Sequence, residues 1–387
     1  MMDAALPLPD VLSDSLVRVL FGFGAIEELG REALRIGATR VLVVTDPGIE
    51  RAGHLDTALQ ALGDASLPFA LFDGAGENPT TEHVAAGMRF ARRGIADLII
   101  GLGGGSAMDC AKGINVILTN GRTVADYWGI DRTTRPLLPM ILVPTTAGTG
   151  SEAQSFALIT DPKTHQKMAC GDHRPPAEGG LRPHLAILDP QVVKTVPREV
   201  AAAAGIDAIA HAIETAGSTA RTNHSLALSK AAWSLLDAAF PRILSGESGE
   251  QDHADMLLGA HLAGAAIEES MLGAAHACAN PLTARFGLAH GLAVGLMLPS
   301  VIRYNHQHGN QPYAALDADS ERLAARVTHL LELAGLPTSL AEADGCAEAT
   351  DLIDELARAA NAQWTAQFNP VPITQDGFAE IYRRAIG

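Results

Sequence analysis

The stretch LIIGLGGGSAMDCAKGI, residues 98–114, decides the fold, because it reads as a buried strand, a glycine-rich turn and a helix in direct succession. Its opening apolar run is typical of a strand that is covered on both faces. Gly103, Gly104 and Gly105 let the backbone come close to a ligand, and we predict that Ser106 caps the helix. Free N–H groups and the dipole at such a helix start suit a pyrophosphate. A tight strand-to-helix turn without a ligand is the alternative.

The chain as a whole falls into two halves that differ in their sequence pattern. In the first half, short β-rich runs alternate with helical patterns, which predicts a mostly parallel sheet covered by helices on both faces. After Pro197, long Ala- and Leu-rich segments with helical spacing follow, and no strand is predicted past Asp189. We therefore predict an α/β domain over residues 1–195 and an all-helical domain over residues 196–387. The β-rich runs are VRVLF, RVLVVTD, PFALFD, ADLIIGLG, LPMILVPTT and LAILDP.

The composition argues against several classes of partner. The formal net charge of −16 disfavours a non-specific grip on nucleic acid. The four cysteines form no CxxC pair, so we expect reduced thiols in a cytoplasmic protein. The opening MMDAALPLPD lacks the basic and apolar regions of a signal peptide, and no run of eighteen apolar residues could span a membrane. We expect neither a nucleic-acid nor a membrane partner.

The glycine loop differs from the usual dinucleotide fingerprint. That pattern is GxGxxG in the first βα turn, with an acid about 20 residues later. Here the candidate acid, Asp46 in VLVVTDPG, precedes the loop, which disfavours a standard Rossmann arrangement. A second polar loop, ILVPTTAGTGSE, follows a predicted strand and places Thr145, Thr146 and Thr149 among glycines. Such a loop can line a cofactor crevice, and a plain hydroxyl-rich turn is the alternative.

One carboxylate and three imidazoles mark the helical half. Asp207 and His211, in GIDAIAHAIE, are four residues apart and share one helix face, although a surface hydrogen-bonded pair would look the same. The proline and glycine in HACANPLTARFGLAH, residues 276–290, argue against one unbroken helix. We expect His276 to end one helical segment and His290 to begin the next, both facing a common space. Together the four side chains suit Fe²⁺, Zn²⁺, Co²⁺ or Ni²⁺.

In combination, these motifs resemble the iron-containing (group III) alcohol dehydrogenase family. The resemblance covers nearly the whole chain and is carried by GGGSAMDCAK, PTTAGTGSEAQSFALITD, GIDAIAHAIE and GLAHGLAVGLMLPSVIRYN. It implies a first, dehydroquinate-synthase-like domain that binds a nicotinamide dinucleotide and a second domain that holds one catalytic metal. It places the cofactor in the cleft between them, and it implies a homodimer.

The resemblance also implies a role for each matching residue. The metal ligands would be the carboxylate and imidazoles named above, with Fe²⁺ or Zn²⁺ as the ion. Asp46 would accept from the adenosine ribose and repel a 2′-phosphate, so NAD is expected rather than NADP. Lys167 would reach a ribose, and Phe156 and Leu158 would line the nicotinamide side. The remaining cofactor residues would be Asn78, Gly103, Gly104, Gly105, Ser106, Asp109, Thr145, Thr146 and Thr149.

One position departs from the family pattern. Many members have a histidine four residues after the third ligand, His276, where this chain has Asn280. An imidazole can relay a proton near neutral pH, and an amide cannot. Asn280 can still donate a hydrogen bond to a substrate oxygen or a ribose, which makes it, with His276, a candidate catalytic residue. The alternative is a helix C-cap before Pro281.

The reaction implied is reversible hydride transfer between a small neutral alcohol, or its aldehyde, and NAD, with the metal as a Lewis acid. The segment EESMLGAAHACAN, residues 268–280, has no Arg or Lys, which favours a neutral substrate. The alternatives are a metal-free reductase or polyol dehydrogenase of the same fold, and a non-catalytic NAD-binding redox sensor. The complete set of ligand types argues against the metal-free protein, and Asn280 favours the sensor.

Overall fold

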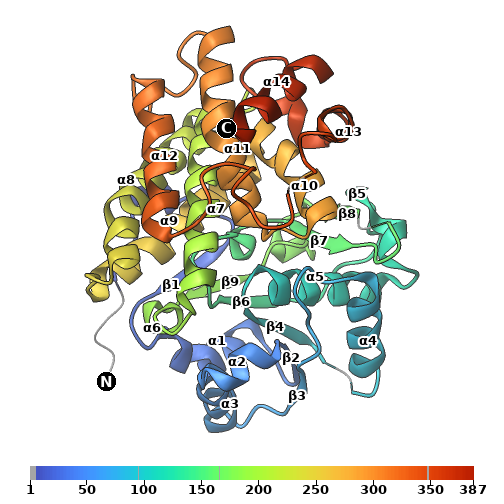
Figure 1. Cartoon of the computed structure of the whole chain (residues 1–387). Helices are drawn as coiled ribbons and strands as arrows, with labels where there is room; N and C mark the ends of the chain where they lie inside the picture. The colour runs from blue at the N-terminus through green and yellow to red at the C-terminus, as the bar shows by residue number, and fades with distance from the viewer. Residues whose placement is uncertain (1–5, 95, 165, 347) are drawn as a thin grey trace. The chain divides into compact units, whose positions relative to one another are not determined.

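The computed structural model describes residues 6–94, 96–164, 166–346 and 348–387. It divides into two compact units, Met1–Val196 and Pro197–Gly387, which are coloured from blue to green and from green to red in Figure 1. Among the described residues, all strands lie in the N-terminal unit and the C-terminal unit is helical. The predicted fold class, a mostly parallel α/β part followed by an all-helical part, is therefore confirmed.

Six parallel strands form the main sheet of the N-terminal unit, in the order β1-β9-β6-β4-β2-β3. Side chains alternate along a strand, so Val41 and Val43 pack on one face of this sheet and Leu42 and Val44 on the other. Both faces are buried, which explains the unbroken apolar runs. The strands are β1 (Arg18–Phe21), β2 (Val41–Val44), β3 (Phe69–Phe72), β4 (Leu98–Gly103), β6 (Met140–Pro144) and β9 (Leu185–Leu188).

Helices cover the two faces of this sheet differently. α1 (Leu29–Ile36) and α3 (His54–Asp64) pack on the face of Val41, whereas α4 (Thr81–Ala91) and α5 (Gly105–Asn120) pack on the face of Leu42. The chain leaves β2 through α2 (Pro47–Arg51) and α3, and it leaves the neighbouring β4 through α5. Two adjacent parallel strands thus send their connections to opposite faces. Open α/β sheets bind ligands at the carboxyl ends of such a strand pair.

A second, three-stranded sheet was not predicted from the sequence. It has the order β5-β8-β7, with β5 (Gly129–Ile130) parallel to β8 (Lys167–Gly171), which pairs antiparallel with β7 (Phe156–Thr160). In β7, Ala157 and Ile159 join the hydrophobic core, whereas Leu158 is 40% exposed. A strand of only two residues and a strand with one solvent-exposed face give a weak sequence pattern. The sequence therefore did not predict this second sheet.

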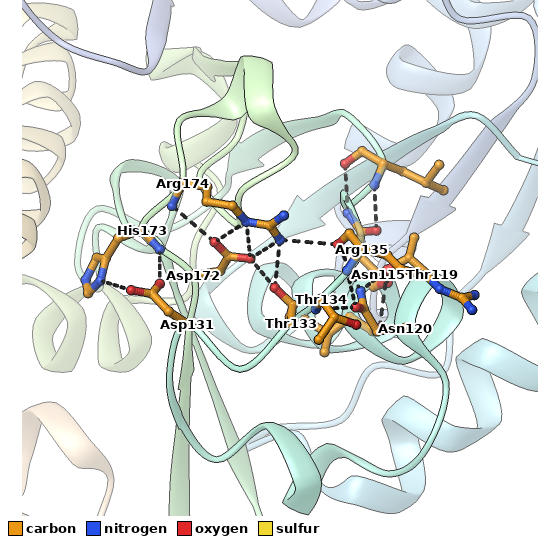
Figure 2. A network of polar contacts seen from close by, with 12 residues as sticks. Asn115, Thr119, Asn120, Asp131, Thr133, Thr134, Arg135, Asp172, His173 and Arg174 are labelled. Carbon is orange, nitrogen blue, oxygen red and sulfur yellow. Dashed lines mark hydrogen bonds and ion pairs between the residues drawn. The ribbon is translucent and has the colours of Figure 1, made fainter.

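A polar network fastens the loop that leads from β5 into β6 (Figure 2). Near the end of α5, Asn115 exchanges two hydrogen bonds with the backbone of Leu138. Asn120 Oδ1 accepts the N–H groups of Thr134 and Arg135, both at 2.8 Å. From the other side, the carboxylate of Asp172 accepts from the guanidinium of Arg174 and, in a short hydrogen bond, from the hydroxyl of Thr133. These contacts fix where β6 begins and hence where the polar loop after it lies.

The C-terminal unit consists of helices rich in alanine and leucine. Arg198 ties the ends of two of them, since its guanidinium donates to the carbonyls of Leu244 and Ala334. No helix of the described ranges is long and apolar enough to cross a membrane. The helices are α7 (Arg198–Gly217), α8 (Asn223–Ser245), α9 (Glu250–Ser270), α10 (Ala274–Phe286), α11 (His290–His308), α12 (Ser320–Ala334), α13 (Ile353–Asn361) and α14 (Gln375–Ile386).

Candidate cofactor and metal sites

Asp46 lies beside the glycine loop, although it precedes the loop in the sequence. β2 and β4 are neighbours in the sheet, so the residues that follow them meet at one edge. A Cβ added to Gly103 would lie 3.2 Å from Asp46 Oδ2 and only 2.6 Å from the Cβ of Ala107. Gly103 also has φ 152°, which a residue with a side chain rarely adopts. Asp46 Oδ1 caps α2 by accepting the N–H of Gly48 at 2.8 Å, and this leaves Oδ2 on the side of the loop.

The second polar loop packs against the same glycines. A Cβ on Gly104 would lie 3.4 Å from the hydroxyl of Thr146, and one on Gly105 would lie 2.6 Å from the methyl of Thr149. Thr145, which is buried, donates its N–H to the carbonyl of Gly103 at 3.0 Å. The closeness of Thr149 therefore requires glycine at position 105, whereas a Cβ on Gly104 would make only ordinary van der Waals contact with Thr146.

The predicted cap of α5 is wrong. The helix begins at Gly105, its N-cap is Gly104, and no side chain caps it. Ser106 lies two positions after the N-cap, and its hydroxyl accepts the N–H of Asn78 at 3.2 Å. The structure thus brings Ser106 and Asn78 together, both of them predicted cofactor residues. The first N–H groups of α5 lack a cap from their own chain neighbours, as the first turn of an anion-binding helix would.

Asp109 lies beneath this surface. Its carboxylate is buried and accepts from the hydroxyl of Ser151 at 2.7 Å and from the N–H of Leu158 at 3.2 Å. Burial raises the pKa of Asp109, and the ammonium of Lys112 opposes that rise. Sequence reasoning missed Lys112, which is fully buried and donates to the carbonyls of Ser151, Gln154 and Phe156 at 2.7–2.8 Å. The pair holds the polar loop and β7 to α5.

The remaining cofactor candidates lie on the small sheet. Phe156, Leu158 and Thr160 share one face of β7, because side chains alternate along a strand. Lys167 pairs with Thr160 in the register of β7 and β8, so it lies on that same face. This is the face turned away from the core residues Ala157 and Ile159.

In the C-terminal unit, three of the four predicted metal ligands converge, and His211 lies beside them. Asp207, His276 and His290 each offer a ligand atom, and these atoms all lie within 4.8 Å of one another. His211 Nε2 lies 3.4 Å from Asp207 Oδ1, as expected for residues four apart on α7. The ring of His211 stacks on that of His276 with centroids 4.9 Å apart. Asp207, His211 and His276 are buried, and His290 is half-buried.

The charges of this cluster reinforce one another. Burial alone would raise the pKa of Asp207, but His211, together with His276 and His290, holds it well below its usual range. Burial likewise opposes the charge on His276, yet Glu214 and Asp207 raise its pKa to about 9. A cluster that favours an ionised carboxylate at Asp207 and a proton on His276 would also attract a divalent cation, which binds once the ligand nitrogens are unprotonated.

His276 occupies a different place from the one predicted. It is the third residue of α10, near the start of a helix, because α9 ends at Ser270 and the backbone of Met271 turns with φ 62°. Pro281 does not interrupt α10, which runs on to Phe286, but the helix ends at Gly287, so the segment to His290 is not one unbroken helix, as predicted. The chain does break after that helix, and His290 begins α11 as predicted.

Close packing brings His290 to Asp207. A Cβ on the next residue, Gly291, would lie 1.9 Å from the carbonyl oxygen of Ala203 and 3.3 Å from the Cβ of Asp207. α11 therefore approaches α7 more closely than any residue with a side chain would allow. Only glycine at position 291 allows the close helix packing that brings His290 to Asp207.

Asn280 lies inside α10, so the C-cap alternative is wrong; Gly287, with φ 70°, is the C-cap. Asn280 Nδ2 donates to Gln363 Oε1 at 3.0 Å, just before the short helix η6 (Trp364–Phe368). The side chain of Asn280 is half-buried, and the hydrogen bond to Gln363 engages one of the two N–H groups of its amide. This position holds a hydrogen-bonding group that does not titrate.

Comparison with known proteins places the whole chain. Residues 17–190 match the family "iron-containing alcohol dehydrogenase", and residues 201–386 match the C-terminal part of the same family. The chain is 35% identical over 286 residues to alcohol dehydrogenase 4 of Schizosaccharomyces pombe, which covers 74% of this chain and 66% of that protein. It is 29% identical over 381 residues to the NAD-dependent methanol dehydrogenase of Bacillus methanolicus, covering 95% and 97% of the two chains.

A solved structure of a related enzyme has the same fold. A 1,3-propanediol oxidoreductase superposes with a TM-score of 0.88 and 30% identity over 100% of both chains. The relatives named here are oxidoreductases that act on alcohols. The chain belongs to the iron-containing alcohol dehydrogenase family. The predicted family and the predicted class of enzyme, an oxidoreductase that acts on CH–OH groups, are confirmed.

Proposed function

We propose that the protein is an NAD-dependent alcohol dehydrogenase, or aldehyde reductase, that requires one divalent metal ion. The observation that carries this proposal is the convergence of Asp207, His276 and His290, with His211 beside them. Asp207 Oδ1 and His276 Nε2 are buried without a hydrogen-bond partner, although they lie only 3.4 Å apart. Buried acceptors without donors are costly, and a cation would satisfy both. The donor set of three imidazoles and one carboxylate fits Fe²⁺ or Zn²⁺.

The two units would have different roles. We assign the dinucleotide to residues 1–195 and the metal and substrate oxygen to residues 196–387. When bound, the ion would polarise the substrate oxygen as a Lewis acid, and the nicotinamide would exchange the hydride. The chain itself would supply orientation through Asp207 and the histidines, His276 among them, and a hydrogen bond from Asn280. An amide cannot relay a proton, so we assign Asn280 no acid–base role.

The dinucleotide would lie at the carboxyl ends of β2 and β4. There the carboxylate of Asp46 would accept from the ribose hydroxyls, and the start of α5 would face the pyrophosphate. Gly103 to Gly105, Thr145, Thr146 and Thr149 border this place. Asn78 and Ser106 lie against each other, and Asp109 acts from beneath by holding the loop. On the small sheet, Phe156, Leu158 and Lys167 would meet the nicotinamide half.

The cofactor preference can be tested at Asp46. Asp46→Ser removes the charge but keeps a side chain that caps helices well, so α2 should survive the change. We expect the wild-type protein to prefer NAD, and the variant to lose most of that preference, because the carboxylate no longer repels a 2′-phosphate. The measurement is the ratio of kcat/KM for NAD to that for NADP. Equal use of both cofactors by the wild-type protein would contradict the assignment.

The reaction itself is tested by metal analysis together with an alcohol and aldehyde panel. We expect about one divalent ion per chain and a rise in NADH absorbance with a small neutral alcohol; chelation should abolish it, and Fe²⁺ or Zn²⁺ should restore it. A metal-free reductase would keep its activity after chelation. A redox sensor would bind NADH but turn over none of the panel, which would refute the proposal.

The finer assignments belong to the same proposal. We infer a cytoplasmic protein because all four cysteines are unpaired and buried, as suits a reducing compartment. We infer a homodimer from the family to which the chain belongs. The net charge of −16 supports the absence of a nucleic-acid partner. Segment 268–280 contains no Arg or Lys that would bind an anionic substrate.

A further inference from the structure

Helix α10 carries His276 in its first turn but has no cap of its own. Its N-cap is Gly273, which has no side chain that could accept a hydrogen bond. The first N–H groups of a helix have no partner within it, so others must satisfy them. Here a different helix and a distant loop do so. A Cβ on Gly273 would lie 3.1 Å from Glu214 Oε1 and 3.2 Å from Asn369 Oδ1.

Glu214, on α7, makes two contacts with the first turn of α10, one with a backbone N–H and one with the ring of His276. One carboxylate oxygen accepts the N–H of Ala275 at 2.7 Å, and the other forms a short hydrogen bond with Nδ1 of His276. The carboxylate is buried and both of its oxygens are engaged. Asn369 accepts the N–H of Ala274 at 3.3 Å and is itself held by two hydrogen bonds to Asn305. Side chains of other elements, Glu214 and Asn369, thus hold the first turn of α10 in place.

We propose that Glu214 is a positioning residue, which determines that Nδ1 of His276 carries a proton and that Nε2 faces Asp207. The inference rests on the proposed function of this cluster as a metal site. An ionised carboxylate can only accept, so the ring must donate from Nδ1. The lone pair of the neutral ring is then on Nε2, which lies 3.4 Å from Asp207 Oδ1. Carboxylate–histidine pairs of this kind set ring orientation and ligand strength at metal sites.

Glu214→Gln separates the two contacts of the carboxylate. The amide oxygen can still accept the N–H of Ala275, so α10 should keep its start. The amide NH₂ group would then face His276 and donate to Nδ1, which moves the ring proton to Nε2 and removes the lone pair from the metal side. We expect Zn²⁺ or Co²⁺ affinity of the full chain, measured by chelator competition, to fall about 10–100-fold. The melting temperature of the metal-free protein should change little.

A matched control exists on the same unit. Glu269 accepts from Nδ1 of His224 at 2.6 Å in a half-exposed pair outside the cluster. Glu269→Gln makes the same chemical change and should leave metal affinity as in the wild type. If E214Q binds the ion as tightly as the wild type, or if E269Q weakens binding equally, the inference is overturned.

A second readout needs neither metal nor activity. Nitrogen-15 spectra of histidine-labelled, metal-free protein, recorded over a pH series that reaches the neutral form of the His276 ring, report which ring nitrogen holds the proton. We expect Nδ1–H in the wild type and Nε2–H in E214Q. A wild-type ring protonated on Nε2 overturns the inference even if E214Q does not fold. If the wild type takes up no divalent ion, the proposed function fails, and the wild-type spectrum alone decides the role of Glu214.

Discussion

Lys112→Met is expected to lower the free energy of unfolding by about 3–5 kcal/mol, because it leaves the buried carboxylate of Asp109 without its ammonium partner. The carbonyls of Ser151, Gln154 and Phe156 would also lose their donor. Urea unfolding, followed by a signal from the N-terminal unit, measures the loss. A change below about 1 kcal/mol would contradict the role given to this lysine.

The pH dependence of this variant follows from the pKa of Asp109. Burial raises that pKa even with Lys112 present, so removal of the ammonium should raise it further. A raised acid pKa in the folded state means that the folded protein binds the proton more tightly, so stability falls as pH rises through this range. Lys112→Met should therefore lose least at acid pH and most near neutrality. In the double variant Lys112→Met/Asp109→Asn, no buried charge is left without a partner, so part of the lost stability should be recovered.

Asp207→Asn is expected to remove the metal and the activity together. A unit charge pair at 4 Å contributes about 4 kcal/mol at an effective dielectric constant of 20, so loss of the carboxylate should weaken binding by about 10³-fold. Metal analysis after dialysis and NADH-linked turnover measure the two effects. Asp237→Asn, on α8, is the matched control, because that carboxylate pairs with Arg326 at 2.6 Å and offers nothing to the cluster. Stoichiometric metal in Asp207→Asn would refute the ligand assignment.

The fold could be predicted from the sequence because the strongest sequence patterns mark the residues that are buried in the core. Buried strands such as LIIGLG are apolar throughout, and Asp207 and His211 have the spacing of one helix face. Pattern alone failed where tertiary contacts replace local signals. α10 continues through Pro281 because the loss of one N–H is offset by the burial of that turn, in which Leu282 is fully covered.

Glu214 and Lys112 show which functional residues remain hidden from sequence reasoning. Glu214 stands three residues after His211 in the quoted motif GIDAIAHAIE, so its helix face was already in view. Its partners, Ala275 and His276, lie on another helix, and their closeness depends on packing that no local pattern encodes. Lys112 reads as an ordinary charged residue in GGGSAMDCAK until the structure shows three carbonyls around it.

The lysine beneath the polar loop also has a consequence for binding entropy. Ordering a flexible backbone costs about 1–2 kcal/mol per residue, and a loop that becomes ordered only on association subtracts that cost from affinity. Here Lys112 has already fixed the carbonyls of Ser151, Gln154 and Phe156 when the chain folds. A dinucleotide bound as proposed would meet a loop that is already ordered. Its affinity would therefore not be reduced by the entropic cost of ordering that loop.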